Sequence, residues 1–401
     1  MPSVTAPPLT RSSREQKLSS LPEVKQFNEN LIIAFSFALC LFIFFAVSAA
    51  KCLSKKAVLN ENREPAKFPE VAFTGASISS FPHGFEEYFD DRFAFRDRII
   101  ADRTLLYLKL FRVSGSSKVI IGKNKFFFYS DDVNLPMIMG SRPFTEPELR
   151  SWKELLERRQ SWCQARGIDY IFVLAPTKPS IYSEFLPDEY GQRSRRTRTD
   201  QLLDFLKQTR SSVQVVDLRA SLRAHKGVLP LFLLTDTHWN QLGAYYGYKA
   251  IIDALTPRHP NLVAPVPLSD LNLRPYHFVK GDLSRMQGVL GIITETNVAV
   301  DHKQPVQACL VRDSQFTENK LGFPVTGAFG YHQERKDLPS AVMFRDSFAC
   351  YMIELYLPQQ FSRISFFWQP DFSQSIVQRE KPEIVVQEIL ESNLYGAPPE
   401  M

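Results

Sequence analysis

Residues 31–50 constrain the fold most, because these twenty residues are apolar or small and none of them is charged. An α-helix of this length spans about 30 Å, which matches the hydrocarbon core of a bilayer. Nothing amphipathic flanks the stretch, which argues against a long helix buried in a soluble core. The apolar region of a signal peptide has about 7–15 residues. We therefore expect a retained transmembrane helix over residues 30–52.

The predicted membrane helix divides the chain into a short polar part and a long remainder. Residues 1–29 are polar and contain several prolines and serines, which predicts a disordered cytoplasmic tail. Residues 53–80 are expected to form a linker, and residues 81–396 one folded domain. Lysine and arginine occur on both sides of the apolar stretch, so the charge rule does not decide its orientation.

The composition of the whole chain is that of a globular protein. Hydrophobic residues make up 44% and charged residues 23% of the chain, and the net charge is +5. No basic stripe interleaved with aromatic residues is present, so we expect no nucleic-acid partner. The five cysteines form neither a disulfide framework nor a metal-spaced pair.

Short apolar runs alternate with helical segments, which predicts an α/β domain with a parallel sheet covered by helices. Residues 170–175 are entirely apolar, as expected for a strand buried on both faces. Residues 257–297 are expected to be irregular. The other predicted strands are residues 119–121, 126–129, 213–216, 306–311, 341–344, 364–368 and 384–386. The predicted helices are residues 84–111, 145–166, 200–209 and 241–255.

Residues 235–240, Thr-Asp-Thr-His-Trp-Asn, stand at the entrance to a predicted helix. In an extended loop, residues i and i+2 project to the same side. Asp236 can then hold one ring nitrogen of His238 and leave the other nitrogen free to take a proton. A capped helix start or a buried histidine would give the same pattern. A metal site is a weaker alternative, because no third ligand is suitably spaced.

A nucleophile for such a base is offered by Ser347, which follows the apolar run 341–344 and precedes a helical segment. A serine at this kind of turn lies at the carboxyl edge of a sheet, beside the free N–H groups of the first helical turn. A helix N-cap would produce the same local sequence. Together, the two motifs favour a proton relay in which His238 links Asp236 to Ser347.

Several further stretches accompany these motifs, and the whole resembles a known family. Residues 236–240 and 345–348 resemble the SGNH-hydrolase-like domain of the alginate O-acetylation proteins and their bacterial relatives, the DHHW family. The resemblance covers about residues 68–394, and Arg345 departs from the glycine usual in SGNH enzymes. The supporting stretches are residues 85–97, 121–129, 176–178, 181–182, 281–285 and 381–388.

The resemblance implies a flavodoxin-like, three-layer parallel sheet with a circularly permuted order of catalytic blocks, since Asp236 and His238 precede Ser347. It implies a membrane-anchored O-acetyltransferase that modifies an extracytoplasmic polysaccharide through an acyl-serine intermediate. The oxyanion is expected to be held by the backbone N–H of Phe348 and by Asn240. The residues expected to contact substrate are Trp239, Asp282 and Arg285.

The resemblance also implies a membrane-bound partner that supplies the acyl group, and a catalytic domain on the outer face of the cytoplasmic membrane. The sequence gives no reason to expect a bound cofactor. Two alternatives remain open. One is an esterase that removes acetyl groups from glycans, and the other is a non-catalytic scaffold in a polysaccharide secretion complex, which the departure at Arg345 allows.

Overall fold

The computed structural model describes residues 22–53, 59, 64–70, 75–190, 196–227, 229–304, 309–311, 328–333, 335–369 and 371–396. Most of the expected tail, much of the expected linker and residues 306–308 of a predicted strand lie outside these residues. The chain divides into two compact units, Met1–Ile100 and Ala101–Met401.

The helices and strands follow one another from the N-terminal unit into the second unit. The helices are α2 (Pro22–Leu53), α3 (Gly75–Arg92), α4 (Arg96–Phe111), α5 (Asn134–Met139), α6 (Glu146–Gln164), α7 (Lys178–Ile181), α8 (Arg198–Gln208), α9 (Leu218–Ala224), α10 (Gln241–Leu255), α11 (Asp282–Met286), α12 (Cys350–Leu355) and α13 (Gln374–Glu380). The strands are β1 (Val119–Ile121), β2 (Phe127–Tyr129), β3 (Asp169–Ala175), β4 (Val215–Asp217), β5 (Leu271–Phe278), β6 (Glu295–His302), β7 (Cys309–Val311), β8 (Phe329–His332), β9 (Ser340–Arg345), β10 (Arg363–Trp368) and β11 (Ile384–Leu390).

The first unit is built around α2. Within the described residues, only its segment Glu29–Ala50 is long and apolar enough to cross a membrane. The single helix predicted over residues 84–111 is wrong, because a turn at residues 93–95 separates α3 from α4. The turn is fixed by packing, since Phe44 of α2 contacts the rings of Phe93 and Phe95 at centroid distances of 6.3 and 5.0 Å.

The second unit contains a seven-stranded sheet in the order β4-β3-β11-β9-β10-β8-β7. The first five strands in this order are parallel to one another. The predicted parallel sheet is present in these five strands, but β8 runs antiparallel to β10, and β7 antiparallel to β8. The α/β class is confirmed, with a mixed sheet in place of a parallel one.

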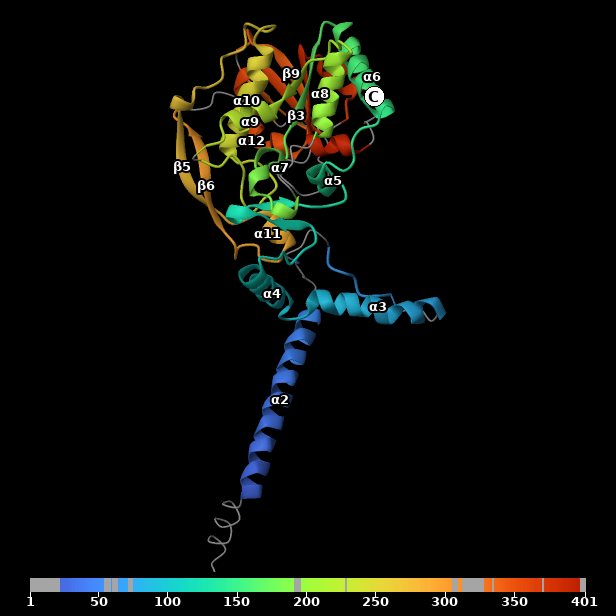
Figure 1. The fold of residues 1–401 in the computed structure, drawn as a ribbon, viewed down its shortest axis with the longest axis vertical. Helices are drawn as coiled ribbons and strands as arrows, with labels where there is room; N and C mark the ends of the chain where they lie inside the picture. Colours follow the sequence, from blue (N-terminus) through green and yellow to red (C-terminus); the bar gives the residue numbers. More distant parts are fainter. Residues whose placement is uncertain are drawn as a thin grey trace, which may run out of the picture. The chain divides into compact units, whose positions relative to one another are not determined.

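Helices cover both faces of the sheet, which confirms the three-layer arrangement (Figure 1). Successive side chains of a strand point to opposite faces. In β3, Ile171 and Val173 pack into the core beneath α9, α10 and α12. The alternate residues Tyr170 and Phe172 pack into a second core beneath α6 and α8. The central strands are therefore apolar on both sides, as predicted.

Two antiparallel pairs lie outside the main sheet. The predicted hairpin is present as β1 and β2. The prediction that residues 257–297 are irregular is wrong, because β5 pairs with β6 over eight residues, from Leu271–His302 to Phe278–Glu295. The proline in β5, Pro275, is exposed, and a proline is tolerated in a two-stranded edge ribbon because it interrupts no central ladder.

Candidate active site

The nucleophile candidate lies directly after a central strand. β9 ends at Arg345, and Ser347 opens a short 3-10 turn, Ser347–Ala349, that continues into α12. β9 is hydrogen-bonded in parallel to both β10 and β11. The carboxyl end of a parallel strand is where active sites of α/β proteins lie. The turn therefore fixes the Ser347 hydroxyl at that edge.

The loop before α10 brings the histidine to the same place. Leu233 N–H donates to the carbonyl of His238 at 3.1 Å, and Asn240 N–H donates to the carbonyl of Leu231 at 2.9 Å. The indole N–H of Trp239 then donates to the carbonyl of Phe348 at 2.8 Å. This bond joins the two motifs, which are more than a hundred residues apart in the chain.

Asp236, His238 and Ser347 form one hydrogen-bonded chain. His238 Nε2 lies 2.8 Å from Ser347 Oγ, and His238 Nδ1 lies 2.7 Å from Asp236 Oδ1. The His238 side chain retains 30% of its accessible surface, and that of Asp236 retains 11%. The histidine is thus open to a ligand on one side and held by a carboxylate on the other.

The charges around the imidazole favour proton transfer. Burial opposes a positive charge on His238, but the hydrogen bond and charge of Asp236, with the nearby Asp282 and Asp346, raise its pKa above the ordinary value. Burial also opposes ionisation of Asp236, yet the His238 side chain and the backbone N–H groups of His238 and Asp282 lower its pKa. Asp236 therefore stays ionised and stabilises an imidazolium.

Asp282 was expected to contact substrate, but its carboxylate instead holds the loop that precedes α10. Its Oδ1 accepts from Thr237 N–H at 2.8 Å, and its Oδ2 accepts from the Thr237 hydroxyl at 2.5 Å. Its own N–H donates to Asp236 Oδ2 at 3.0 Å. A side chain at Gly281 would collide with the Thr235 carbonyl at 2.2 Å, so α11 can approach this closely only with glycine there.

Lys178 and Glu295 support the same loop from behind. The Lys178 ammonium donates to the carbonyls of Phe127 and Leu234 at 2.8 and 3.2 Å, and burial lowers its pKa to about 8. Glu295 accepts from the N–H groups of Leu234 and Thr235 at 2.7 and 2.8 Å. The sequence analysis included Lys178 only in the supporting stretch 176–178, and it missed Glu295, which lies in the unpredicted β6.

The expected oxyanion donors are both engaged elsewhere, which corrects their assignment. Phe348 N–H donates to Asp346 Oδ1 at 2.8 Å, as in a capped helix start. The Asn240 amide donates to the Pro230 carbonyl and to Asn297 Oδ1, both at 2.6 Å. Among the residues that the structure describes, no acceptor faces the N–H of Ser347.

Trp239 is likewise not a surface for stacking a sugar, since it retains only 1% of its accessible surface. Its ring packs edge-on against Phe348, 5.2 Å between centroids. The role of Trp239 is to hold the turn Ser347–Ala349, which we call the nucleophile turn. Arg285 is partly exposed on α11, and no hydrogen bond or ion pair of its guanidinium is found within the described residues. Its contact with substrate stays a prediction.

The nucleophile turn rests on a buried acid that the sequence did not reveal. Asp346 Oδ2 accepts from Leu390 N–H at 2.6 Å, and Asp346 N–H donates to Glu388 Oε2 at 3.0 Å. Burial and the charge of Asp346 raise the pKa of Glu388 well above its ordinary value. Arg345 is fully buried beside them, with its guanidinium 4.2 Å from the centre of the Trp368 ring.

A metal ion would compete with these bonds. Asp236, His238 and Asp282 offer ligand atoms within 4.8 Å of one another. Both ring nitrogens of His238 and both carboxylate oxygens of Asp282 already have hydrogen-bond partners. The arrangement suits proton transfer better than metal coordination.

Comparison with known proteins identifies the family of this chain. The model for the SGNH hydrolase-like domain, acetyltransferase AlgX, matches residues 119–319, half of the chain. The chain belongs to this family. The matched segment includes Asp236 and His238 and ends before Ser347.

Individual relatives add to the family match. A probable alginate O-acetylase AlgJ from Pseudomonas aeruginosa is 29% identical over 179 residues, which are 44% of this chain and 43% of the relative. The corresponding protein of Pseudomonas putida is 28% identical over 149 residues, 37% of this chain and 36% of the relative. This chain thus spans less than half the length of the curated relatives it matches.

Among solved structures, a DHHW family protein from Eubacterium siraeum aligns with a TM-score of 0.50 and 16% identity. The alignment covers 69% of this chain and 95% of the other. This likeness shows a shared fold, in agreement with the SGNH-like architecture. The permuted order of catalytic blocks stays a prediction.

Proposed function

We propose that this protein is a membrane-anchored O-acetyltransferase that modifies an extracytoplasmic polysaccharide through an acetyl-Ser347 intermediate. The observation that carries the proposal is the chain of hydrogen bonds from Ser347 Oγ through His238 to Asp236, at 2.8 and 2.7 Å. The similarity to probable alginate O-acetylases supports acetyl transfer to a polysaccharide. The acyltransferase domain is proposed to extend over residues 81–396.

In the first half-reaction, Ser347 Oγ attacks the carbonyl carbon of the acetyl donor. His238 Nε2 takes the hydroxyl proton and delivers it to the departing group of the donor, and Asp236 holds the ring tautomer. In the second half-reaction, a sugar hydroxyl attacks the acetyl-serine and loses its proton to His238. The proton returns to Ser347 Oγ as the acetylated sugar leaves.

The oxyanion of each tetrahedral intermediate needs a donor. We assign the N–H of Ser347 to this role, in place of the engaged Phe348 N–H. Ser347 N–H stands at the first position of the turn Ser347–Ala349, where helical N–H groups have no partner within the helix. The carboxylate of Asp346 caps the turn through Phe348 N–H at 2.8 Å and holds its geometry.

The anchor and its partner complete the proposal. The segment Glu29–Ala50 of α2 is proposed to be a single-pass anchor in the cytoplasmic membrane, with the catalytic domain in the periplasm or outside the cell. A membrane-bound partner protein is proposed to supply the acetyl group, because an activated acetyl donor is made in the cytoplasm and the site lies across the membrane from it.

The test is an acetyl-transfer assay on the full chain in detergent micelles. p-Nitrophenyl acetate is the donor, and uronic acid oligosaccharides are the acceptors. Nitrophenol release and acetylated oligosaccharide are measured for the wild type, Ser347→Ala and the control Ser375→Ala, which removes an exposed hydroxyl. Acetylated product from the wild type and the control alone is expected.

Two other results would redirect the proposal. Release of acetate and nitrophenol with no acetylated sugar would indicate an esterase. A wild type that shows no turnover, either with this donor or with membranes containing the proposed acetyl-donating partner, would contradict an enzyme and favour a scaffold.

A further inference from the structure

Helix α3, in the first unit, carries an aromatic face that the catalytic chemistry does not use. The rings of Phe81, Phe85, Phe89 and Phe93 follow one another at spacings of four residues. Their consecutive centroid distances are 6.0, 6.4 and 6.1 Å. Phe68 packs edge-on against Phe81 and Phe85 at 6.2 Å. The result is a continuous apolar ridge along one side of the helix.

This ridge is exposed at Ile78 and Phe85 and half-buried at Phe81 and Phe89, and the opposite side of α3 is charged. Ile78 retains 63%, Phe85 42% and Phe68 52% of their accessible surface. At 3.6 residues per turn, Ile78, Phe81, Phe85 and Phe89 fall within an arc of about 100°. The opposite side carries the exposed side chains of His83, Glu87 and Asp90 and the buried Asp91, and the exposed Glu86 lies at the border between the two sides. Such a division between faces is typical of helices that lie in a membrane interface.

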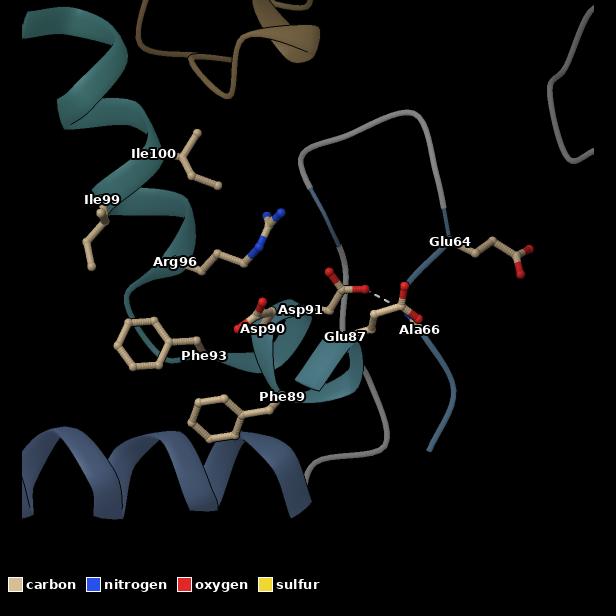
Figure 2. Close-up of a pocket in the computed structure, with 10 residues that line it drawn as sticks. All are labelled: Glu64, Ala66, Glu87, Phe89, Asp90, Asp91, Phe93, Arg96, Ile99 and Ile100. Atoms are coloured by element: carbon tan, nitrogen blue, oxygen red, sulfur yellow. Dashed lines mark hydrogen bonds between the residues drawn. The ribbon is translucent and has the colours of Figure 1, made fainter. Parts of the chain in front are cut away.

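The ridge is continuous with the apolar segment of α2. Phe44 stacks on Phe93, and the N–H of Ala94 donates to the Ser48 hydroxyl at 3.4 Å. Figure 2 shows the rings of Phe89 and Phe93 on the side of α2, with the carboxylates of Asp90 and Asp91 away from it. The C-terminal end of α3 is therefore fixed to the last turns of the apolar segment.

The depth of the contact between Phe44 and Phe93 in the membrane indicates what covers the ridge. Phe44 precedes Ala50, the last residue of the apolar segment, by about 9 Å along the helix axis. If α2 spans a bilayer, a turn packed against Phe44 lies at the level of the outer acyl chains. The side chains of a ridge that extends from that turn then contact lipid before they contact water.

We propose that α3 lies in the membrane interface beside α2, with Ile78, Phe81, Phe85 and Phe89 among the lipids and the acidic side in water. This inference rests on the proposed anchor but not on the acetyl chemistry. The carboxylates of Glu86, Glu87 and Asp90 repel anionic headgroups, so the surface fits zwitterionic lipids and its binding is driven by apolar burial.

The experiment places single added tryptophans in the full chain reconstituted in phosphatidylcholine vesicles. The phospholipid carries bromines near the top of its acyl chains, which quench only fluorophores at that depth. The signal is the change relative to the unsubstituted chain, which has four tryptophans. Phe85→Trp and the more exposed Ile78→Trp report the ridge, and His83→Trp and Glu87→Trp report the opposite side. Phe37→Trp lies near the middle of the apolar segment, and it reports insertion of α2 in separate vesicles whose phospholipid carries bromines near the ends of its acyl chains.

We expect loss of the added emission at positions 78 and 85 and none at positions 83 and 87. A quenched Phe37→Trp with unquenched ridge variants would overturn the inference and indicate that a protein partner covers the ridge. Equal quenching of all four α3 variants would overturn the proposed orientation. An unquenched Phe37→Trp would refute the anchor itself, and with it this inference, while leaving the acetyltransferase chemistry untouched.

Discussion

Replacement of Glu388 by glutamine tests the account of how the nucleophile turn is held. Glu388 lies fully buried on β11, and its Oε2 accepts the N–H of Asp346 at 3.0 Å. Burial and the charge of Asp346 raise the pKa of Glu388 well above its ordinary value. Burial and the charge of Asp346 therefore favour the neutral acid form of Glu388 in the folded protein, and Gln matches that form in shape and charge. The unfolded chain ionises this residue at neutral pH.

The direction and size of the effect follow from proton linkage. Between the unfolded and the folded pKa of Glu388, the folded state binds more protons than the unfolded state. The free energy of unfolding of the wild type therefore falls as the pH rises, by up to about 1.4 kcal/mol per pH unit. Gln binds no proton in either state. The free energy of unfolding of Glu388→Gln relative to that of the wild type should therefore rise between pH 5 and pH 7, by at most about 3 kcal/mol.

The assay is urea unfolding in detergent micelles at pH 5, 6 and 7, followed by tryptophan fluorescence. Glu383→Gln serves as the control for the exchange of Glu for Gln, because Glu383 is exposed and directly precedes the same strand. Acetyl transfer by Glu388→Gln should remain near that of the wild type. The assay compares the free energy of unfolding of Glu388→Gln with that of the wild type. A difference that does not change with pH, or that falls as the pH rises, would refute the neutral form of Glu388 in the folded protein.

Three further predictions concern the relay and its support. Asp236→Asn should lower kcat/KM by roughly 10³- to 10⁴-fold with little change in unfolding, because the His238 tautomer is lost; an activity loss below tenfold would contradict the role of Asp236. The rate of nitrophenol release should rise with pH through a pKa above 6.5, because only neutral His238 accepts the proton and its pKa is raised; a flat profile between pH 5 and 8 would contradict it. Burial lowers the pKa of Lys178 to about 8, so between pH 8 and 10 the folded state binds fewer protons than the unfolded state. The free energy of unfolding of the wild type relative to that of Lys178→Met should therefore rise over this range. Urea titrations at pH 7 to 10 measure this difference.

The sequence predicted the contact between Asp236, His238 and Ser347 because each motif follows an apolar run and precedes a helix. Residues in such positions converge at one edge of a sheet. The same feature misled the assignment of oxyanion donors. Asn240 accepts the N–H of Gly243 at 2.9 Å as the N-cap of α10. Asp346 likewise caps the turn after β9 through Phe348 N–H. Side chains just before a helix satisfy that helix first.

The residues that sequence reasoning missed are acids on strands. Glu388 stands in the largely apolar run 384–390, and Glu295 stands between two threonines. Only tertiary pairing brings them to Thr235 and Asp346. A carboxylate near the end of a buried strand was the available signal for Glu388. No such signal existed for Glu295, because Pro275 obscured the β5–β6 ribbon on which its position depends.

The central claim is that Ser347 carries the acetyl group. Its most direct test is intact-mass and peptide mass analysis of the full chain after brief exposure to p-nitrophenyl acetate, for the wild type and for His238→Ala. The account predicts one added acetyl group, located on the peptide that contains Ser347 and absent from the variant. An acetyl group on another residue, or equal acetylation of both proteins, would contradict it.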